Sequence, residues 1–179
     1  MHRRVRAGTF MCALVVLALV ALGPVVFRQG GVWTIGTPTI PRGGAGDTGL
    51  YVRHATALLG RYDGAVVTYG KLLDRRDMNP ALVLDPEWSR ANDRVVEDLH
   101  VVYSDALELT YPDPAGDTHR CIIESTRLTY LGSKMLQDGF LTDGHGAYYL
   151  GSHGNWNLNL GTTRMATCRT SLALLTQPR

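Results

Sequence analysis

The sequence predicts a mainly α-helical protein: one N-terminal transmembrane helix followed by an exported up-and-down bundle of about four helices. Three observations predict this class. An uncharged apolar run of twenty residues, 8–27, follows a basic start. Apolar residues then recur at helical spacing in four segments between 47 and 179. A glycine- and aromatic-rich segment, 138–161, separates the last two of these segments and is expected to form a long loop.

The N-terminal apolar run is predicted to be a retained signal anchor with the start of the chain in the cytoplasm. As a helix, the run is long enough to cross the ~30 Å hydrocarbon layer. Arg3, Arg4 and Arg6 precede it, and positive charges stay on the cytoplasmic side. A cleaved secretory signal is the alternative, but its apolar core is shorter, ~7–15 residues, and Pro24 would block the cut. Residues 1–27 are therefore interpreted as basic segment and anchor of a single-pass membrane protein.

The rest of the chain divides into a linker and one domain. Residues 28–46 are rich in glycine and proline, and Pro38 and Pro41 favour extended backbone in the residues before them. Apart from a possible small hairpin at 155–160, no convincing run of alternating strand residues appears in the chain. Residues 47–179 are expected to form the helical domain, which lies on the extracytoplasmic side (periplasmic or cell-surface) if the anchor is retained.

The charge of the exported part argues against nucleic acid as a partner. Three of the 18 Lys and Arg residues precede the anchor, which leaves 15 against 16 Asp and Glu, all of which follow it. The exported part is therefore close to −1 in formal charge. Without an excess of positive charge it has little with which to neutralise phosphates.

The strongest periodicity predicts a helix that begins after Asp47. Its apolar residues recur in steps of three and four. They are Tyr51, Ala55, Leu58, Tyr62, Ala65, Tyr69 and Leu72. Gly60 and Gly64 weaken the middle by up to ~1 kcal/mol each relative to alanine. One long helix and two shorter helices hinged at Gly60 are both compatible with this pattern.

The same stretch resembles part of a tetratricopeptide repeat. From Gly60 to Leu72 the sequence is similar to the turn and second helix of that repeat, with Tyr62, Ala65 and Tyr69 at the expected spacing. The resemblance implies a helical hairpin in a protein-interaction adaptor. Arg53 stands where the repeat expects glycine, and no second copy follows, although such repeats stack in arrays of about three or more.

A second helix is predicted from capping signals. Asp85 is a suitable N-cap and Pro86 suits the first helical position. The helix is expected to end before Pro112. Its apolar stripe consists of Trp88, Ala91, Val95, Leu99, Val102, Ala106 and Leu109.

Two more helices complete the predicted bundle. The third begins near Asp117 or Thr118 and ends before Gly139. The fourth runs from about Thr162 to Thr176. Their stripes contain Cys121, Ile122, Ser125, Leu128, Leu131 and Met135 in the third, and Met165, Cys168, Leu172 and Leu175 in the fourth.

The cysteines are consistent with export. Cys121 and Cys168 fall on the apolar stripes of the third and fourth helices, so neighbouring helices would let them meet. A disulfide between them is predicted because the domain is assigned to an oxidising compartment. Two buried free thiols are the alternative.

The predicted loop is the candidate contact surface. Phe140, Tyr148, Tyr149 and Trp156 carry more apolar area than is comfortable in water, and are predicted to contact a partner. As an alternative, Asp143, His145 and His153 are a possible ligand set around a cofactor. Their spacing matches no metal motif, so exposed or backbone-bonded loop histidines are the favoured interpretation.

No residue pattern points to catalysis, and no catalytic residue, metal or cofactor is predicted. The expected function is therefore a non-catalytic accessory or scaffold subunit of a larger membrane protein complex. Its partners would be membrane lipid through the anchor and other integral membrane subunits. A membrane-tethered enzyme or ligand-binding domain, the tetratricopeptide-like adaptor and a pilin-type component are the alternatives. The last is disfavoured because the apolar run has no acidic residue.

Overall fold

The computed structural model describes two separate units of the chain. The first unit, 1–39, contributes a short hairpin, and the second, 40–179, contributes a helical bundle. The described residues are 26–28, 31–33, 44, 46–142 and 144–177.

The first unit contains an antiparallel pair of strands, β1 (Val26–Arg28) and β2 (Gly31–Trp33). Val26 lies opposite Trp33 in its register. Branched and aromatic residues favour strands, which explains the pairing of these short segments. The expectation that only 155–160 could contain strands is corrected here, as is the expectation that the anchor helix extends to residue 27.

The rest of the predicted anchor, residues 8–25, lies outside the described residues. Of the helices that the structure does describe, none combines the length and the apolar character needed to cross a bilayer.

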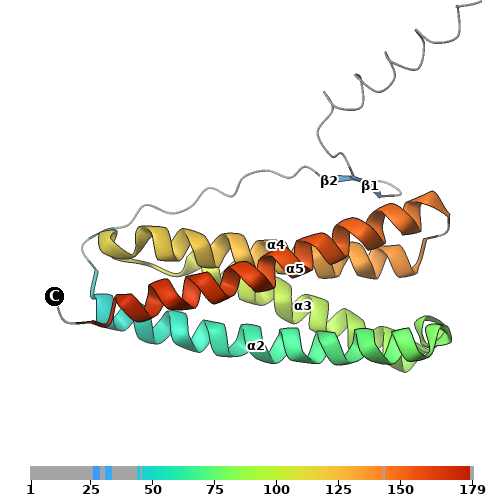
Figure 1. The fold of residues 1–179 in the computed structure, drawn as a ribbon, viewed down its shortest axis with the longest axis horizontal. Helices are drawn as coiled ribbons and strands as arrows, with labels where there is room; N and C mark the ends of the chain where they lie inside the picture. Colours follow the sequence, from blue (N-terminus) through green and yellow to red (C-terminus); the bar gives the residue numbers. More distant parts are fainter. Residues whose placement is uncertain (1–25, 29–30, 34–43, 45, 143, 178–179) are drawn as a thin grey trace, which may run out of the picture. The chain divides into compact units, whose positions relative to one another are not determined.

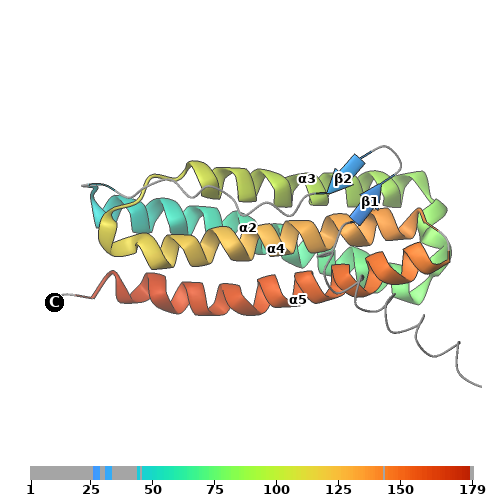
Figure 2. The same ribbon diagram turned by 90° about the horizontal axis from the view of Figure 1, so that it is seen from above.

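The second unit confirms the expected up-and-down bundle of four helices (Figures 1 and 2). Figure 2 shows α3 and α5 along opposite edges, with α2 and α4 between them. The helices are α2 (Thr48–Met78), α3 (Pro86–Glu108), α4 (Gly116–Phe140) and α5 (His145–Leu174). Two 3₁₀ turns, η1 (Pro80–Leu84) and η2 (Asp113–Ala115), lie in the connections.

Helix α2 is one continuous rod of 31 residues. The carboxylate of Asp47 caps it by accepting hydrogen bonds from the backbone N–H groups of Gly49 and Leu50. The helix passes through Gly60 without a turn, so the helical hairpin implied by the tetratricopeptide resemblance is wrong. Its predicted stripe is buried on both sides of Gly60, and this continuous burial holds the two halves in one helix.

Helix α3 begins and ends as the sequence predicts. Asp85 is its N-cap, with Oδ1 2.7 Å from the backbone nitrogen of Glu87, and Pro86 occupies the first turn. The helix stops at Glu108, ahead of Pro112. Five residues of its stripe are buried: Trp88, Val95, Leu99, Val102 and Ala106.

Three buried polar side chains of the core bond to neighbouring helices. The Tyr62 hydroxyl lies 2.8 Å from Thr129 Oγ1. The Tyr69 hydroxyl donates to the Ser133 carbonyl at 3.0 Å, and Trp88 Nε1 donates to the Leu72 carbonyl at 3.2 Å. These bonds fix α2 against α3 and α4, because each group would lose its partner if the helices slid.

The predicted long loop is the main correction. Residues 145–161 form the first half of α5, and only a short turn around Gly144, with φ +67°, separates α5 from α4. Glycines permit the two helices to approach closely. A Cβ on Gly154 would lie 2.8 Å from Leu136 Cγ, and one on Gly161 would lie 2.5 Å from Thr129 Oγ1. The glycines are thus packing positions of a helix and not loop residues.

The chain reaches the bundle at the α3–α4 connection. The Gly44 amide donates to the Tyr111 carbonyl, and the Asp113 amide donates to the Gly44 carbonyl, each at 3.2 Å. Gly44 therefore ties the end of the linker to the bundle just before α2 begins.

Candidate interaction surface

The predicted contact residues separate into different environments. Phe140, at the end of α4, is half-buried and packs edge-on against Trp88 with ring centroids 5.6 Å apart. The guanidinium of Arg76 covers the same ring at 4.7 Å. Phe140 is therefore largely used inside the domain and leaves little surface for a partner.

The other three aromatic residues lie on α5. Tyr148 and Trp156 are 79% and 69% exposed. Tyr149 is half-buried and stacks on His153 at 4.0 Å, one helical turn away. Tyr148 and Trp156 are therefore the predicted contact residues that remain most open to a partner.

Large exposed apolar side chains gather at one end of the bundle. Besides Tyr148, they are Met78, Leu84 and Leu141, which are 79%, 83% and 78% exposed. These four are the most exposed large apolar residues in the described part of the chain. All belong to the end where α2 stops, α3 begins, and α4 turns into α5 (Figure 1). We call this set the apolar tip.

Sequence reasoning missed three residues of the apolar tip. Met78 is the last residue of α2, Leu84 is the last residue of the 3₁₀ turn η1, and Leu141 follows the last residue of α4. Turns ordinarily favour Gly, Pro, Asn, Asp and Ser. The available signal in the sequence was that Met78 and Leu84, two bulky apolar residues, stand next to the turn residues Asn79 and Asp85.

Two ion pairs lie near the apolar tip. Arg76 forms an ion pair with Asp77 while it covers the ring of Phe140. Lys134 Nζ lies 2.8 Å from Asp138 Oδ1, one turn along α4.

The two histidines of the alternative ligand set lie apart on α5. Asp143 lies outside the described residues, and His145 and His153 are exposed. Eight helical positions separate the Cα atoms of the two histidines by ~12 Å along the axis. The His153 Nδ1 lies 3.1 Å from the Tyr149 carbonyl oxygen, as expected for a backbone-bonded histidine. Within the described residues, no three His, Cys, Asp or Glu side chains are close enough to share a metal ion.

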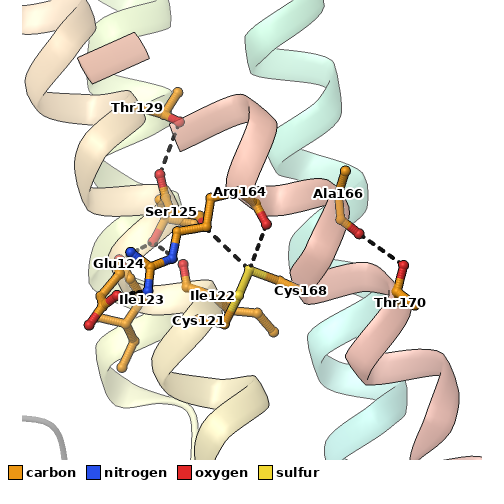
Figure 3. The surroundings of a disulfide bond; sticks show 11 residues. Cys121, Ile122, Ile123, Glu124, Ser125, Thr129, Arg164, Ala166, Cys168 and Thr170 are labelled. Atoms are coloured by element: carbon orange, nitrogen blue, oxygen red, sulfur yellow. Dashed lines mark hydrogen bonds and ion pairs between the residues drawn. A yellow bond between two sulfur atoms is a disulfide. The ribbon is translucent and has the colours of Figure 1, made fainter. Parts of the chain in front are cut away.

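The predicted disulfide is present and joins α4 to α5 (Figure 3). Cys121 and Cys168 have Cα atoms 5.5 Å apart. The Ser125 hydroxyl lies 3.3 Å from the Cys168 sulfur and can donate to it, since a disulfide sulfur carries no hydrogen. An ion pair between Arg164 and Glu124 lies beside the bond and links the same two helices.

A buried histidine that the sequence analysis did not single out lies near the other end of the bundle. His119 of α4 is fully buried and stacks on Tyr111, with ring centroids 4.2 Å apart. Tyr51 meets the same ring edge-on at 5.9 Å. Neither imidazole nitrogen has a hydrogen-bond partner among the described residues. Burial therefore lowers the pKa of His119 to about 4.

An open groove of about 500 Å³ lies between α2 and α5, away from the apolar tip. Its floor includes Leu59 and Leu172, and the ion pair between Asp63 and Arg169 borders it. None of the predicted contact or ligand residues lines this groove.

The fold and surface thus define a disulfide-linked four-helix bundle with an apolar tip. Comparison of the chain with family models, with curated proteins and with solved structures gave no match.

Proposed function

We propose that this chain is a non-catalytic accessory or scaffold subunit of a larger membrane protein complex. A single N-terminal anchor within residues 1–27 holds it in the bilayer, and the helical domain docks on the outer, extracytoplasmic face of the complex. The apolar tip is the proposed contact with an integral membrane subunit.

The exposed apolar tip is the observation that carries this proposal. Burying one Met or Leu side chain fully contributes about 1.5–3 kcal/mol, and the four tip residues are each about four-fifths exposed. Soluble domains rarely gather bulky apolar groups in this way unless the patch binds something. Met and Tyr are also enriched in protein interfaces. A partner's apolar surface is therefore the ligand that the tip suits best.

The disulfide supports the proposed location. Such bonds persist in oxidising compartments and are rare in the cytosol. An extracytoplasmic domain agrees with the basic residues Arg3, Arg4 and Arg6 staying on the cytoplasmic side.

Gentle purification of the full chain from native membranes, without crosslinking, tests the proposal. We expect stoichiometric co-purification with a multisubunit membrane assembly. The triple variant Leu84→Ser, Leu141→Ser, Tyr148→Ser should bind the assembly at least about tenfold more weakly, because each truncation removes a desolvated contact. The matched control is Val67→Ser with Val101→Ser, which removes exposed apolar groups from the sides of α2 and α3. This control variant should still co-purify with the assembly.

Two results would contradict the proposal. Retention of the assembly by the tip variant, at the level of the control, would show that the tip is not the contact. A chain that purifies alone and carries bound metal would favour the enzyme or ligand-binding alternative built on Asp143, His145 and His153. Circular dichroism of each variant verifies that helix content is unchanged.

A further inference from the structure

The outer side of α5 carries a second candidate surface, distinct from the apolar tip. Eight of its residues recur with alternating steps of four and three, the spacing of a helix–helix seam. Seven of the eight are exposed and Tyr149 is half-buried. They are Tyr149, His153, Trp156, Leu160, Thr163, Thr167, Thr170 and Leu174. We call this set the outer seam; it is ~38 Å long.

The outer seam points away from the rest of the bundle. The buried residues of α5 are Gly154, Gly161, Met165, Cys168 and Leu172, which occupy the opposite side of the helix. Figure 2 shows α5 along one edge of the bundle, so no other described helix of the chain covers that outer side. Within the part of the chain that the structure describes, the seam is therefore open to a partner.

The outer seam contains no Asp, Glu, Lys or Arg residue. Helix α5 has two arginines, Arg164 and Arg169, and both form ion pairs with other helices, to Glu124 and Asp63. The exposed side of α3 differs, since it carries Arg90, Asp93, Arg94, Glu97 and Asp98. An ordinary solvated face is charged, and depletion of charge together with aromatic residues is typical of interface cores.

Side-chain size changes along the outer seam. The first half is bulky, with Tyr149, Trp156 and Leu160, and the second half begins with smaller side chains, Thr163 and Thr167. Two such seams fit each other best when they run in opposite directions. Trp156 of one copy then lies opposite Thr167 of the other, and Leu160 lies opposite Thr163. A parallel pair would place Trp156 against itself and leave a gap along the threonines, which costs packing energy.

We propose that the outer seam binds a second copy of this chain, with the two α5 helices antiparallel about a two-fold axis between Leu160 and Thr163. Without Asp, Glu, Lys or Arg on either face, two identical surfaces meet with little like-charge repulsion. Opposed helix dipoles favour the antiparallel direction. The contact uses the same patch on both copies, so it closes as a dimer and does not propagate.

A size exchange across the contact tests the dimer and its register. Sedimentation equilibrium of the full chain in density-matched detergent should give a dimer for the natural sequence. Trp156→Thr leaves a gap opposite Thr167, and Thr167→Trp places two tryptophans in collision, so each single variant should weaken the dimer about tenfold or more. The double variant exchanges the two side chains, restores one large and one small residue at each pair, and should recover the dimer.

The opposite results would overturn the proposal. A monomeric natural chain, or a double variant no better than the worse single variant, excludes this seam or this register. Trp156 and Thr167 are both exposed in the isolated chain, so neither single variant should disturb the fold. Circular dichroism checks this point for every variant.

Cysteine pairing gives the direction of the two helices independently. In a Cys12→Ser background, two differently tagged full chains carry Trp156→Cys and Thr167→Cys and are mixed before mild oxidation. An antiparallel dimer links the two tags, and neither chain alone links to itself. Self-linked Trp156→Cys chains would indicate a parallel pair and contradict the proposal. The absence of any link would also contradict it when the chains are mixed well above the concentration, roughly tenfold higher than for the natural chain, that offsets the loss of the Trp156 ring. Val67→Cys on α2 is the control and should stay unlinked.

Discussion

His119 is the residue whose chemistry is changed most clearly by the fold. It is fully buried between Tyr111 and Tyr51, in surroundings that penalise a charged ring. The predicted stripe of the third helix did not include it, because the buried face of α4 is centred on another side of the helix and contains only Ile122 and Ser125 of that stripe. Its burial has a measurable consequence for stability.

We predict that the bundle loses stability as the pH falls from about 6.5 to 4. Burial lowers the pKa of His119 from 6.5 to about 4, so the unfolded chain binds a proton in this range while the folded chain does not. The contribution of neutral His119 to the free energy of unfolding is therefore fully present above pH 6.5. It falls by roughly 3 kcal/mol between pH 6.5 and 4. Urea unfolding at several pH values, with the disulfide intact, measures this slope.

The control for this prediction is His119→Phe. Phenylalanine keeps an aromatic ring in the site and removes the titrating group. The unfolding free energy of the variant should therefore change less between pH 6.5 and 4 than that of the natural chain. Equal slopes would show that other groups dominate the pH dependence.

At the scale of the element, the two kinds of helical glycine in the bundle differ in their surroundings. Gly60 of α2 has no neighbouring atom within 4 Å of the place where a Cβ would stand. A Cβ on Gly161 of α5 would lie 2.7 Å from the Thr129 nitrogen and 2.8 Å from the Ser125 carbonyl oxygen. Gly60 therefore only lowers the stability of its own helix, whereas Gly161 is required for the close contact between α4 and α5.

We predict opposite effects for the same substitution at these two positions. Gly60→Ala should stabilise the chain by roughly 0.5–1 kcal/mol, because alanine is the better helix former and meets open space. Gly161→Ala should destabilise it by about 1–3 kcal/mol, because the added methyl group forces α4 and α5 apart. Chemical denaturation compares the two directly. A stabilising Gly161→Ala would contradict the close crossing.

These glycines also explain how much of the fold could be predicted from the sequence. Helices α2 and α3 bury large apolar side chains at regular steps, so their stripes and the Asp85 cap were visible in the sequence. The first half of α5 buries Gly154 and Gly161, which add no apolar signal and are ordinarily read as breakers. The helix was therefore predicted to begin near Thr162, not at His145.

The same error affected the candidate surface. Placing Tyr148, Tyr149 and Trp156 in one loop predicted a single contact patch. Because they lie on a helix, Tyr148 belongs to the apolar tip, whereas Tyr149 and Trp156 belong to the outer seam. Which residues share a face depends on the helical phase, which a loop prediction does not supply.

At the scale of the whole molecule, the disulfide closes a long segment of chain. Cys121 and Cys168 are 47 residues apart in sequence. In the chain-entropy model, closing a loop of this length stabilises the fold by about 4 kcal/mol. We predict that Cys121→Ser with Cys168→Ser lowers the unfolding free energy by about this amount, measured by urea denaturation. No change relative to the natural oxidised chain would contradict a stabilising role.

The two proposed surfaces share no residue. The apolar tip lies at the end of the bundle and the outer seam runs along its side. An antiparallel dimer would direct its two tips to opposite ends. Variants of one surface should therefore leave binding at the other unchanged, so the two proposals fail or succeed separately.

The position of the chain ends has a practical consequence for labelling. Helix α2 starts and α5 finishes at the same end of the bundle, opposite the apolar tip (Figure 1). A fluorescent reporter or affinity handle fused behind the C-terminus would sit roughly 46 Å from Met78, the length of α2. Imaging and pull-down probes attached there should leave the docking end unobstructed.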